Sequence, residues 1–381
     1  MRKLLLASAM ALIAAAPLVS GPVMAKTKIG MITTLSGGGS HLGIDVRDGF
    51  LLAMKQAGDP AEVLVRDDAR KPDVAKSHAD ELLQKEGVPI MTGIIWSNIA
   101  IALVPQMVRG GTFYLSPNAG PSKLAGKLCH QNYFNVSWQN DNLPEAMGAY
   151  MKDKGFKKPL LLAPNYPAGQ DMMKGFQRYF GTAHQEIFTK LGQKDYAAEI
   201  SQIRASGADS LFYFLPGGMG IAFMKQYAAA GVDLPVYGPV FSFDHVILGA
   251  IGDAAIGVVN TTQWSRDLDN AANKTFMESF RAEYGRDPTF YASQGYDTGL
   301  LIASALAKAD PESDPDGFRA ALKAAEFDST RGPFAFNTNN HPIQNVYVQE
   351  VVQGESQPVN QLVGTAIEGH KDAYAAECKL Q

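Results

Sequence analysis

Two loop segments of this chain carry groups that could hold a small organic anion. The segment 93–98 brings Ser97 to the start of a predicted helix, and the segment 116–121 offers Asn118 and successive backbone amides. A hydroxyl and free amides at a helix start are suited to a carboxylate. Ser97 could equally be a simple N-cap that needs no ligand.

Aromatic side chains stand near these segments and follow other predicted strands. Trp96 directly precedes Ser97, and Tyr166 lies between a strand and a helix, where it could cover a ligand ring or form a surface turn. Phe241 and Phe243 follow the last short strand, where a loop would ordinarily be polar. The sequence therefore predicts a site with a polar end and aromatic walls. For Trp264 and Tyr291, further along the chain, core packing is the simpler role.

A glycine-rich loop, 36–43, follows the first predicted strand and contains His41. It does not match a dinucleotide fingerprint, because the third required glycine would fall on Leu42. Such loops in α/β proteins are usually tight turns. His41 remains a candidate ligand contact.

The residue patterns give no support for catalysis, a cofactor or a metal. The 7 His are scattered without zinc-site spacing, and no Gly-x-Ser-x-Gly elbow is present. Asp67 and Asp68 are adjacent at the end of a predicted strand. Adjacent strand residues point to opposite faces, and such a pair is usually solvated. We therefore expect a protein that is not an enzyme.

Strands and helices alternate along the chain in two series that must position these loops. The first runs from a strand at 28–33 to one at 112–115, and the second from 160–163 to 236–237. Asp45 stands where the N-cap of the first helix is expected. Helices between strands indicate βαβ units and parallel sheets, whose ligands bind beyond the carboxyl ends of the strands. The expected fold class is α/β, with two doubly wound lobes.

Three polar, irregular stretches suggest that the chain passes between the lobes more than once. They fall at 137–142, 264–273 and 337–342. The predicted first lobe comprises residues 26–142 plus 268–337, and the predicted second lobe comprises residues 143–267 plus 338–381.

The amino terminus has the features of a secretory signal peptide. Arg2 and Lys3 precede an apolar run at 4–19, and small residues stand before a cleavage site after Ala25. An uncleaved anchor is the alternative. We expect a periplasmic protein that begins at Lys26.

The charge is mildly acidic. The 34 Lys and Arg against 38 Asp and Glu give −4, and removal of Arg2 and Lys3 would make this −6. Without a clustered basic surface, nucleic-acid binding is not expected. In an exported chain Cys129 and Cys378 permit one disulfide, although two free thiols are also possible.

Several segments together resemble the leucine/isoleucine/valine-binding family of type I periplasmic binding proteins. They are Gly93-Ile94-Ile95-Trp96-Ser97, Ser116-Pro117-Asn118-Ala119-Gly120-Pro121, Tyr196-Ala197-Ala198-Glu199-Ile200 and Gly252-Asp253-Ala254-Ala255-Ile256-Gly257. The resemblance implies two lobes joined by a three-strand hinge, with the ligand in the cleft between them. It also implies a monomer that delivers its ligand to the membrane permease of an ABC transporter.

The resemblance carries over to particular residues. Ser97 matches a ligand-binding serine, and Asn118 to Gly120 match a second binding segment, with Gly120 where amino-acid binders have threonine. Val240 stands where those members place the acidic partner of the ligand's ammonium, which argues against an α-amino acid.

An aromatic carboxylic acid, such as a benzoate or phenylpropanoid derivative, is the expected ligand. The alternatives are a branched-chain amino acid in the same transport role and a sensory receptor for a chemotaxis or kinase partner. The candidate ligand-binding residues are His41, Trp96, Ser97, Asn118, Ala119, Gly120, Tyr166, Phe241 and Phe243.

Overall fold

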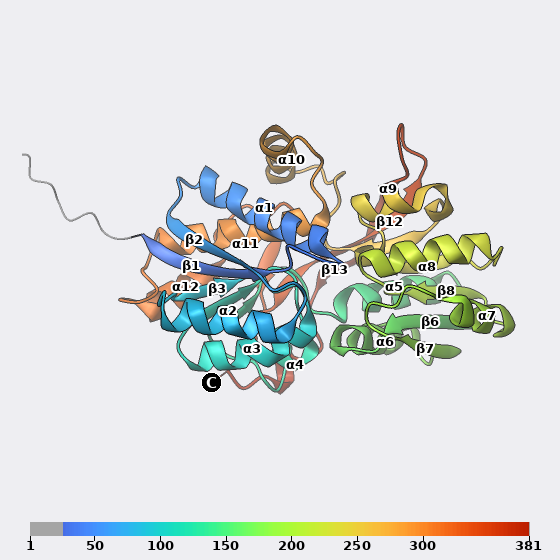
Figure 1. Cartoon of the computed structure of the whole chain (residues 1–381), viewed down its shortest axis with the longest axis horizontal. Coiled ribbons are helices and arrows are strands. Elements are labelled where there is room, and N and C mark those ends of the chain that lie inside the picture. The colour runs from blue at the N-terminus through green and yellow to red at the C-terminus, as the bar shows by residue number, and fades with distance from the viewer. Residues whose placement is uncertain (1–25, 381) are drawn as a thin grey trace, which may run out of the picture.

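The computed structural model describes residues 26–380, so the predicted signal peptide lies outside the described residues. Figure 1 shows two α/β lobes side by side, each a sheet covered by helices. The predicted α/β class with two doubly wound lobes is confirmed. Within residues 26–380, no helix is long and apolar enough to span a bilayer.

The first lobe is built on a five-stranded parallel sheet with the order β2-β1-β3-β4-β5. The strands are β1 (Thr27–Thr33), β2 (Ala61–Asp67), β3 (Ile90–Thr92), β4 (Phe113–Ser116) and β5 (Tyr133–Asn135). The order reverses between β1 and β3, which makes this the switch point where a crevice opens beyond the carboxyl ends of the strands.

The second lobe repeats this arrangement in the order β7-β6-β8-β9-β10, extended by antiparallel strands. The strands are β6 (Pro159–Pro164), β7 (Gln185–Thr189), β8 (Ser210–Tyr213), β9 (Val236–Pro239), β10 (Val259–Thr262), β11 (Phe334–Phe336), β12 (Pro342–Val352) and β13 (Val359–His370). Its switch point lies between β6 and β8.

Helices cover both sheets, as the alternation of strands and helices in the sequence predicts. In the first half of the chain they are α1 (Ser40–Gln56), α2 (Pro72–Gln84), α3 (Ser97–Arg109), α4 (Ser122–Ala125), α5 (Asn142–Asp153) and α6 (Pro167–Phe180). The others are α7 (Ala197–Ala205), α8 (Gly218–Ala229), α9 (His245–Ile251), α10 (Ala271–Tyr284), α11 (Phe290–Leu306) and α12 (Pro315–Ala324). Short 3₁₀ turns occur at Val240–Ser242, Gly252–Ala255 and Ala375–Glu377.

The chain returns to the first lobe after β10, because α11 packs along α1 (Figure 1). The two helices approach closely at glycines: a Cβ on Gly49 would lie 1.9 Å from the carbonyl oxygen of Ala292, and one on Gly295 would lie 2.0 Å from that of Val46. Any larger residue at either position would push the helices apart.

The predicted N-cap at Asp45 is wrong. Helix α1 begins five residues earlier, at Ser40, after Gly39 in the left-handed conformation. Asp45 is instead a buried residue on the body of the helix, where it accepts from Thr289 Oγ1 at 2.5 Å and pairs with Arg286. The sequence pattern missed this start because the first turn of α1 has no acidic residue.

Three segments connect the lobes, after β5, after β10 and after α12. Arg331, in the third segment, binds to the first: its buried guanidinium donates to the carbonyl oxygens of Val136 and Ser137. It also donates to Asp297 on α11 and to Gln344 on β12. The lobe boundaries predicted from the sequence stay predictions. β11, at 334–336, falls in the range predicted for the first lobe but pairs with β12 of the second sheet.

The carboxyl-terminal segment is fixed to the first lobe by a disulfide bond between Cys129 and Cys378, which are 249 residues apart in sequence. Of the two possibilities that the sequence left open for these cysteines, the structure contains the bridge.

Candidate functional site

A cavity lies where the carboxyl ends of the two sheets face each other. Its walls combine loops after β3, β4 and β5 with loops after β6, β8 and β9, so both switch points contribute. The space inside it that the centre of a water molecule can reach is about 20 Å³. The lining residues are Leu42, Ile95, Trp96, Ser97, Asn118, Ala119, Trp138, Asn140, Tyr166, Ala168, Phe214, Pro216, Phe241 and Tyr291. None of them carries a charge at neutral pH.

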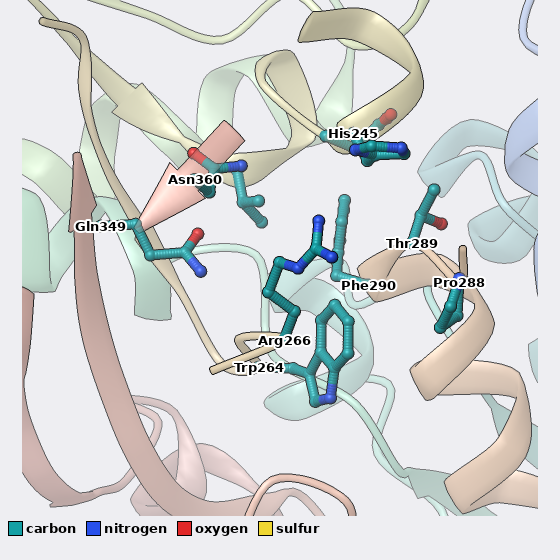
Figure 2. Close-up of a pocket in the computed structure, with 10 residues that line it drawn as sticks. His245, Trp264, Arg266, Pro288, Thr289, Phe290, Gln349 and Asn360 are labelled. Carbon is teal, nitrogen blue, oxygen red and sulfur yellow. The ribbon is translucent and has the colours of Figure 1, made fainter. Parts of the chain in front are cut away.

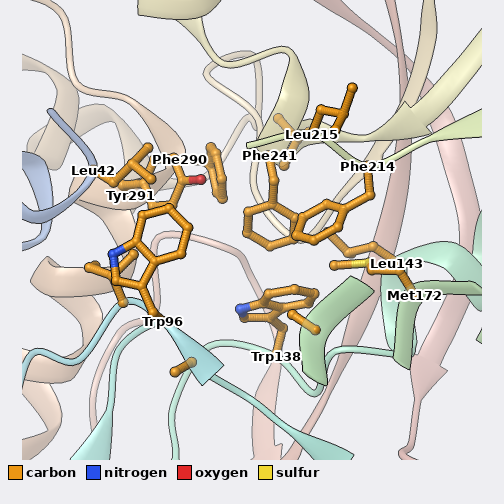
Figure 3. Close-up of a cluster of buried hydrophobic side chains, with 14 of the residues drawn as sticks. Leu42, Trp96, Trp138, Leu143, Met172, Phe214, Leu215, Phe241, Phe290 and Tyr291 are labelled. Carbon is orange, nitrogen blue, oxygen red and sulfur yellow. The ribbon is translucent and has the colours of Figure 1, made fainter. Parts of the chain in front are cut away.

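Six aromatic side chains line the cavity, and Figure 3 shows five of them: Trp96, Trp138, Phe214, Phe241 and Tyr291. The rings of Trp138 and Phe241 have centroids 3.9 Å apart, and Tyr166 stacks on Phe214 at 6.4 Å with an angle of 11°. Trp96 of the first lobe lies 6.5 Å from Tyr166 of the second. Such a wall favours a flat, unsaturated ligand.

The indole of Trp96 is held in place by a chain of hydrogen bonds. Its Nε1 donates to Thr34 Oγ1 at 2.9 Å, and the Thr34 hydroxyl donates to Asp68 Oδ1 at 2.6 Å. Asp68 is fully buried, so the expectation that the Asp67-Asp68 pair is solvated is wrong for this residue. The guanidinium carbon of Arg70 lies over the indole, 5.2 Å from the ring centroid. The ring is therefore fixed before any ligand arrives.

One end of the cavity is polar. Ser97 begins α3, whose first turn leaves backbone amides without helical partners. The Nδ2 of Asn140 donates to Ser97 Oγ at 3.2 Å. Trp138 Nε1 and the side-chain oxygens of Asn118 and Asn140 are buried and have no hydrogen-bond partner among the described residues. A buried polar group without a partner is costly, so these atoms are suited to a ligand that completes them.

The two tyrosines of the cavity stay neutral. Burial raises the pKa of Tyr166 and that of Tyr291 above the ordinary value of a phenol. Their hydroxyl groups can therefore donate or accept hydrogen bonds but add no charge.

The structure brings six of the nine predicted ligand-binding residues into the wall of this cavity. These six are Trp96, Ser97, Asn118, Ala119, Tyr166 and Phe241. Whether each of them contacts a ligand stays a prediction.

The other three predicted residues lie elsewhere. Phe243 is fully buried in the second lobe against Tyr213, with ring centroids 4.9 Å apart. Gly120 packs behind the wall, because a Cβ there would lie 2.1 Å from the carbonyl oxygen of Trp138. His41 faces Asp244 across the boundary between the lobes, with 3.7 Å between Nε2 and Oδ2.

The pair formed by His41 and Asp244 joins α1 of the first lobe to the N-cap of α9 in the second. At 3.7 Å the two atoms are too far apart for a hydrogen bond, so the interaction is one of charge. Burial lowers the pKa of His41, but the nearby carboxylates of Asp244 and Asp45 outweigh it and leave the pKa raised.

Sequence reasoning missed several wall residues. Trp138 and Asn140 lie in the segment interpreted only as a crossing, and Tyr291 was given a core role. Phe214 was not singled out; β8 ends at Tyr213, which leaves Phe214 in the loop that follows the strand. The turn signal Pro216-Gly217-Gly218 is the feature that could have identified this loop.

A second cavity lies beside the first, with about 30 Å³ of space that the centre of a water molecule can reach (Figure 2). Its walls include Trp264, Gln349 and Arg266, and Figure 2 shows the Arg266 side chain between those of Gln349 and Phe290. Val240 lines this second cavity and not the first. The argument against an α-amino acid therefore rests on the whole lining of the first cavity, which contains no acidic side chain, and not on Val240 alone.

Among residues 26–380, no group of three or more His, Cys, Asp or Glu is arranged to hold a metal ion. The polar groups of the first cavity are hydroxyl, amide and indole groups, without a nucleophile paired to a general base. The arrangement is suited to holding a ligand.

Two doubly wound lobes with a cavity between their switch points define a two-lobed ligand-binding protein. A family model described as periplasmic binding protein matches residues 26–356. This match spans most of the chain, which therefore belongs to the periplasmic binding protein family. The resemblance seen in the sequence is confirmed.

Individual relatives agree with this assignment. The Leu/Ile/Val-binding protein homolog 6 of Brucella melitensis is 28% identical over 345 residues, which are 86% of this chain and 88% of that protein. A solute-binding protein of an ABC transporter from R. palustris, crystallised in complex with benzoate, is 30% identical; the alignment covers 93% of this chain and 100% of that one, with a TM-score of 0.87.

A further solved relative is a solute-binding protein of an ABC transporter from Rhodopseudomonas palustris BisB5 in complex with 3,4-dihydroxy benzoic acid. It is 28% identical, the alignment covers 91% of this chain and 99% of that one, and the TM-score is 0.82.

Proposed function

We propose that this chain is the substrate-binding component of an ABC-type uptake transporter and that it captures an aromatic carboxylic acid. A benzoate or phenylpropanoid derivative fits the proposal. The single observation that carries the ligand class is the lining of the first cavity. It combines aromatic walls, a polar end and no charged side chain. At the polar end the Ser97 hydroxyl and the Trp138 indole N–H can donate to a carboxylate, and the amide oxygens of Asn118 and Asn140 can accept from a ligand hydroxyl. The benzoate and dihydroxybenzoate complexes of the relatives support the same class.

A carboxylate can be stabilised here without a cation. The amino terminus of α3 carries the equivalent of roughly half a positive charge, and Ser97 and Trp138 add a hydroxyl and an indole N–H. The ring of the ligand would then lie among Trp96, Tyr166 and Phe241. Each favourable aromatic pair contributes about 0.5–1.5 kcal/mol beyond the burial of its surface.

An α-amino acid fits this cavity less well. Its ammonium would be buried without an acidic partner among the lining residues, at a cost of several kcal/mol. A branched-chain amino acid nevertheless remains the alternative ligand, because the Brucella relative is named for leucine, isoleucine and valine.

In the proposed cycle, the ligand enters the open form, adds contacts to both lobes and favours closure. The closed protein, acting as a monomer in the periplasm after cleavage behind Ala25, delivers the ligand to the membrane permease. A sensory role for the closed form is the alternative of a different class. Co-purification with membrane partners separates the two roles, because a transport receptor is recovered with a permease and a sensor with a receptor or kinase.

The ligand class is tested by calorimetric titration and thermal shift of the mature protein. Benzoate and 4-hydroxybenzoate form one arm, and leucine, isoleucine and valine form the other. A ligand present at 100 times its Kd should add about 2.7 kcal/mol of stability. We expect a shift with the aromatic acids only. Binding of the amino acids alone would contradict the proposed ligand and leave the transport role intact.

A variant pair tests the polar end of the cavity. Ser97→Ala should weaken binding of an aromatic acid by about 10- to 100-fold, as expected for a lost hydrogen bond to a charged group. The matched control is Ser201→Ala on the exposed face of α7, which should bind as the wild type does. Equal affinities for both variants would remove Ser97 from the site.

A further inference from the structure

Asp171, on α6 of the second lobe, accepts hydrogen bonds from three groups that come from outside its own helix. Its Oδ2 accepts from the backbone amide of Ser122 at 3.0 Å and from Asn140 Nδ2 at 2.9 Å. Its Oδ1 accepts from the hydroxyl of Ser122 at 2.5 Å. Ser122 begins α4 of the first lobe, and Asn140 lies in the segment that connects the lobes. These contacts therefore depend on the two lobes being together.

The carboxylate of Asp171 fixes the orientation of the Asn140 amide. An ionised carboxylate only accepts hydrogen bonds, so the Asn140 atom that faces it must be the nitrogen. The same nitrogen also faces Ser97 Oγ at 3.2 Å. An amide nitrogen has two hydrogens, and these two contacts use both of them. If the amide turned over, its oxygen would face a carboxylate, which is unfavourable.

The orientation of Asn140 in turn decides what the Ser97 hydroxyl can do. Because Ser97 Oγ accepts a hydrogen from Asn140, its own hydrogen must point elsewhere. Within residues 26–380 no acceptor for this hydrogen is found, although Ser97 is only 3% exposed and lines the first cavity. The free direction is the cavity, where a ligand's oxygen can accept it.

We propose that Asp171 is a positioning residue for ligand binding. When the lobes close, its carboxylate engages Ser122 and Asn140, and Asn140 then turns the Ser97 hydroxyl hydrogen toward an acceptor oxygen of the ligand. Closure of the lobes thereby orients the Ser97 hydroxyl as a hydrogen-bond donor to the ligand. The inference rests on the proposed function in one respect: it takes this acceptor oxygen to belong to the ligand's carboxylate.

A double-mutant cycle separates this role from a simple contact between the lobes. Asp171→Asn should weaken binding of benzoate or 4-hydroxybenzoate by about tenfold in the wild-type background. In the Ser97→Ala background, where no hydroxyl is left to orient, the same substitution should change affinity by no more than about twofold. Asp153→Asn, which removes a charge from an exposed residue of the second lobe, is the matched control and should have no effect.

An additive result, with tenfold losses in both backgrounds, would overturn the proposal and leave Asp171 as a contact that holds the lobes together. If Asp171→Asn fails to fold, as judged by circular dichroism, Asn140→Ala replaces it. That variant should lose about as much affinity as expected for Asp171→Asn and show the same lack of additivity with Ser97→Ala.

The aromatic acids and the branched-chain amino acids also show whether a failure concerns the role of Asp171 or the proposed ligand class. If the wild type binds leucine and no aromatic acid, the proposed ligand is wrong, and the same cycle is run with leucine, whose carboxylate is also an acceptor. If no acid binds, the cross-lobe contact is tested by hydrogen exchange at the Ser122 amide. Exchange that is equally fast in the wild type and in Asp171→Asn would overturn the proposal.

Discussion

Replacement of Arg331 by methionine should strongly destabilise the junction between the lobes. Arg331 is 1% exposed, and its guanidinium donates to Asp297 Oδ2, to Gln344 Oε1 and to two backbone carbonyls, each at 2.8 Å. The acceptors belong to α11, to β12 and to the segment after β5, so one side chain joins three parts of the chain. Methionine fills a similar volume but supplies no donor.

The expected loss follows from the charge that remains. Asp297 would keep its hydrogen bonds from Ser329 Oγ and the Thr330 amide but lose its ion pair inside the protein. Removing one partner of a buried pair costs about 3–5 kcal/mol. The carbonyl oxygens of Val136 and Ser137 also lose a donor, but this adds little. We therefore expect Arg331→Met to lower the free energy of unfolding by about 4 kcal/mol. Arg331→Met combined with Asp297→Asn should recover about 2 kcal/mol, since no stranded charge remains.

Urea unfolding of the mature protein, followed by circular dichroism, measures both losses. The matched control is Lys76→Met in the exposed pair of Lys76 with Asp80, whose side chains are 59% and 41% exposed and which should matter by less than about 0.5 kcal/mol. A loss below about 1 kcal/mol for Arg331→Met would refute the reasoning. So would a double variant that is no more stable than the single one.

Three further predictions concern the closed form, the carboxyl terminus and the cavity wall. Burial lowers the pKa of His41, but Asp244 outweighs this effect, so the pKa lies above 6.5. The charged His41 therefore attracts Asp244 fully below pH 6.5. This attraction between the lobes is lost as the pH rises through the raised pKa. Titration calorimetry should find about two- to threefold weaker ligand binding at pH 8.5 than at pH 6, and no such change in His41→Gln. Cys378→Ser should cost about 2–4 kcal/mol, seen as a lower melting temperature that reductant does not change further, whereas reductant lowers that of the wild type. Gly120→Ala should weaken ligand binding at least tenfold by calorimetry, because its Cβ would displace the carbonyl of Trp138; unchanged affinity would mean that the wall tolerates this shift.

The part of the site that could be predicted from the sequence follows one rule. Ser97, Asn118 and Tyr166 stand in loops that follow parallel strands, and ligands bind beyond the carboxyl ends of such strands. The rule needs only the order of strands and helices along the chain. The rule does not say how deeply a side chain is buried. It therefore placed Phe243 in the site, although Phe243 lies in the core of the second lobe.

The residues that sequence reasoning missed depend on contacts between distant segments. Trp138 and Asn140 look like parts of a polar connection. Only contacts with distant segments place them in the wall: Trp138 packs on Phe241, and Asn140 donates to Ser97 and Asp171. From the sequence Asp68 looks like one of a solvated pair. In the structure it accepts a hydrogen bond from Thr34, which in turn accepts one from Trp96. Asp45 was mistaken for an N-cap because its partners, Arg286 and Thr289, are more than 240 residues away.

By itself, the sequence determined the α/β class, the two lobes, the family and the loops in which binding groups lie. These follow from local periodicity and from the order of elements, which the chain carries in neighbouring residues. Only the tertiary structure decided which of these groups share one cavity and which polar atoms remain unpartnered. It also decided that Asp171 of one lobe reaches Ser122 of the other. Such contacts arise from the packing of the two lobes, and no local pattern in the chain encodes the distance between residues 49 positions apart.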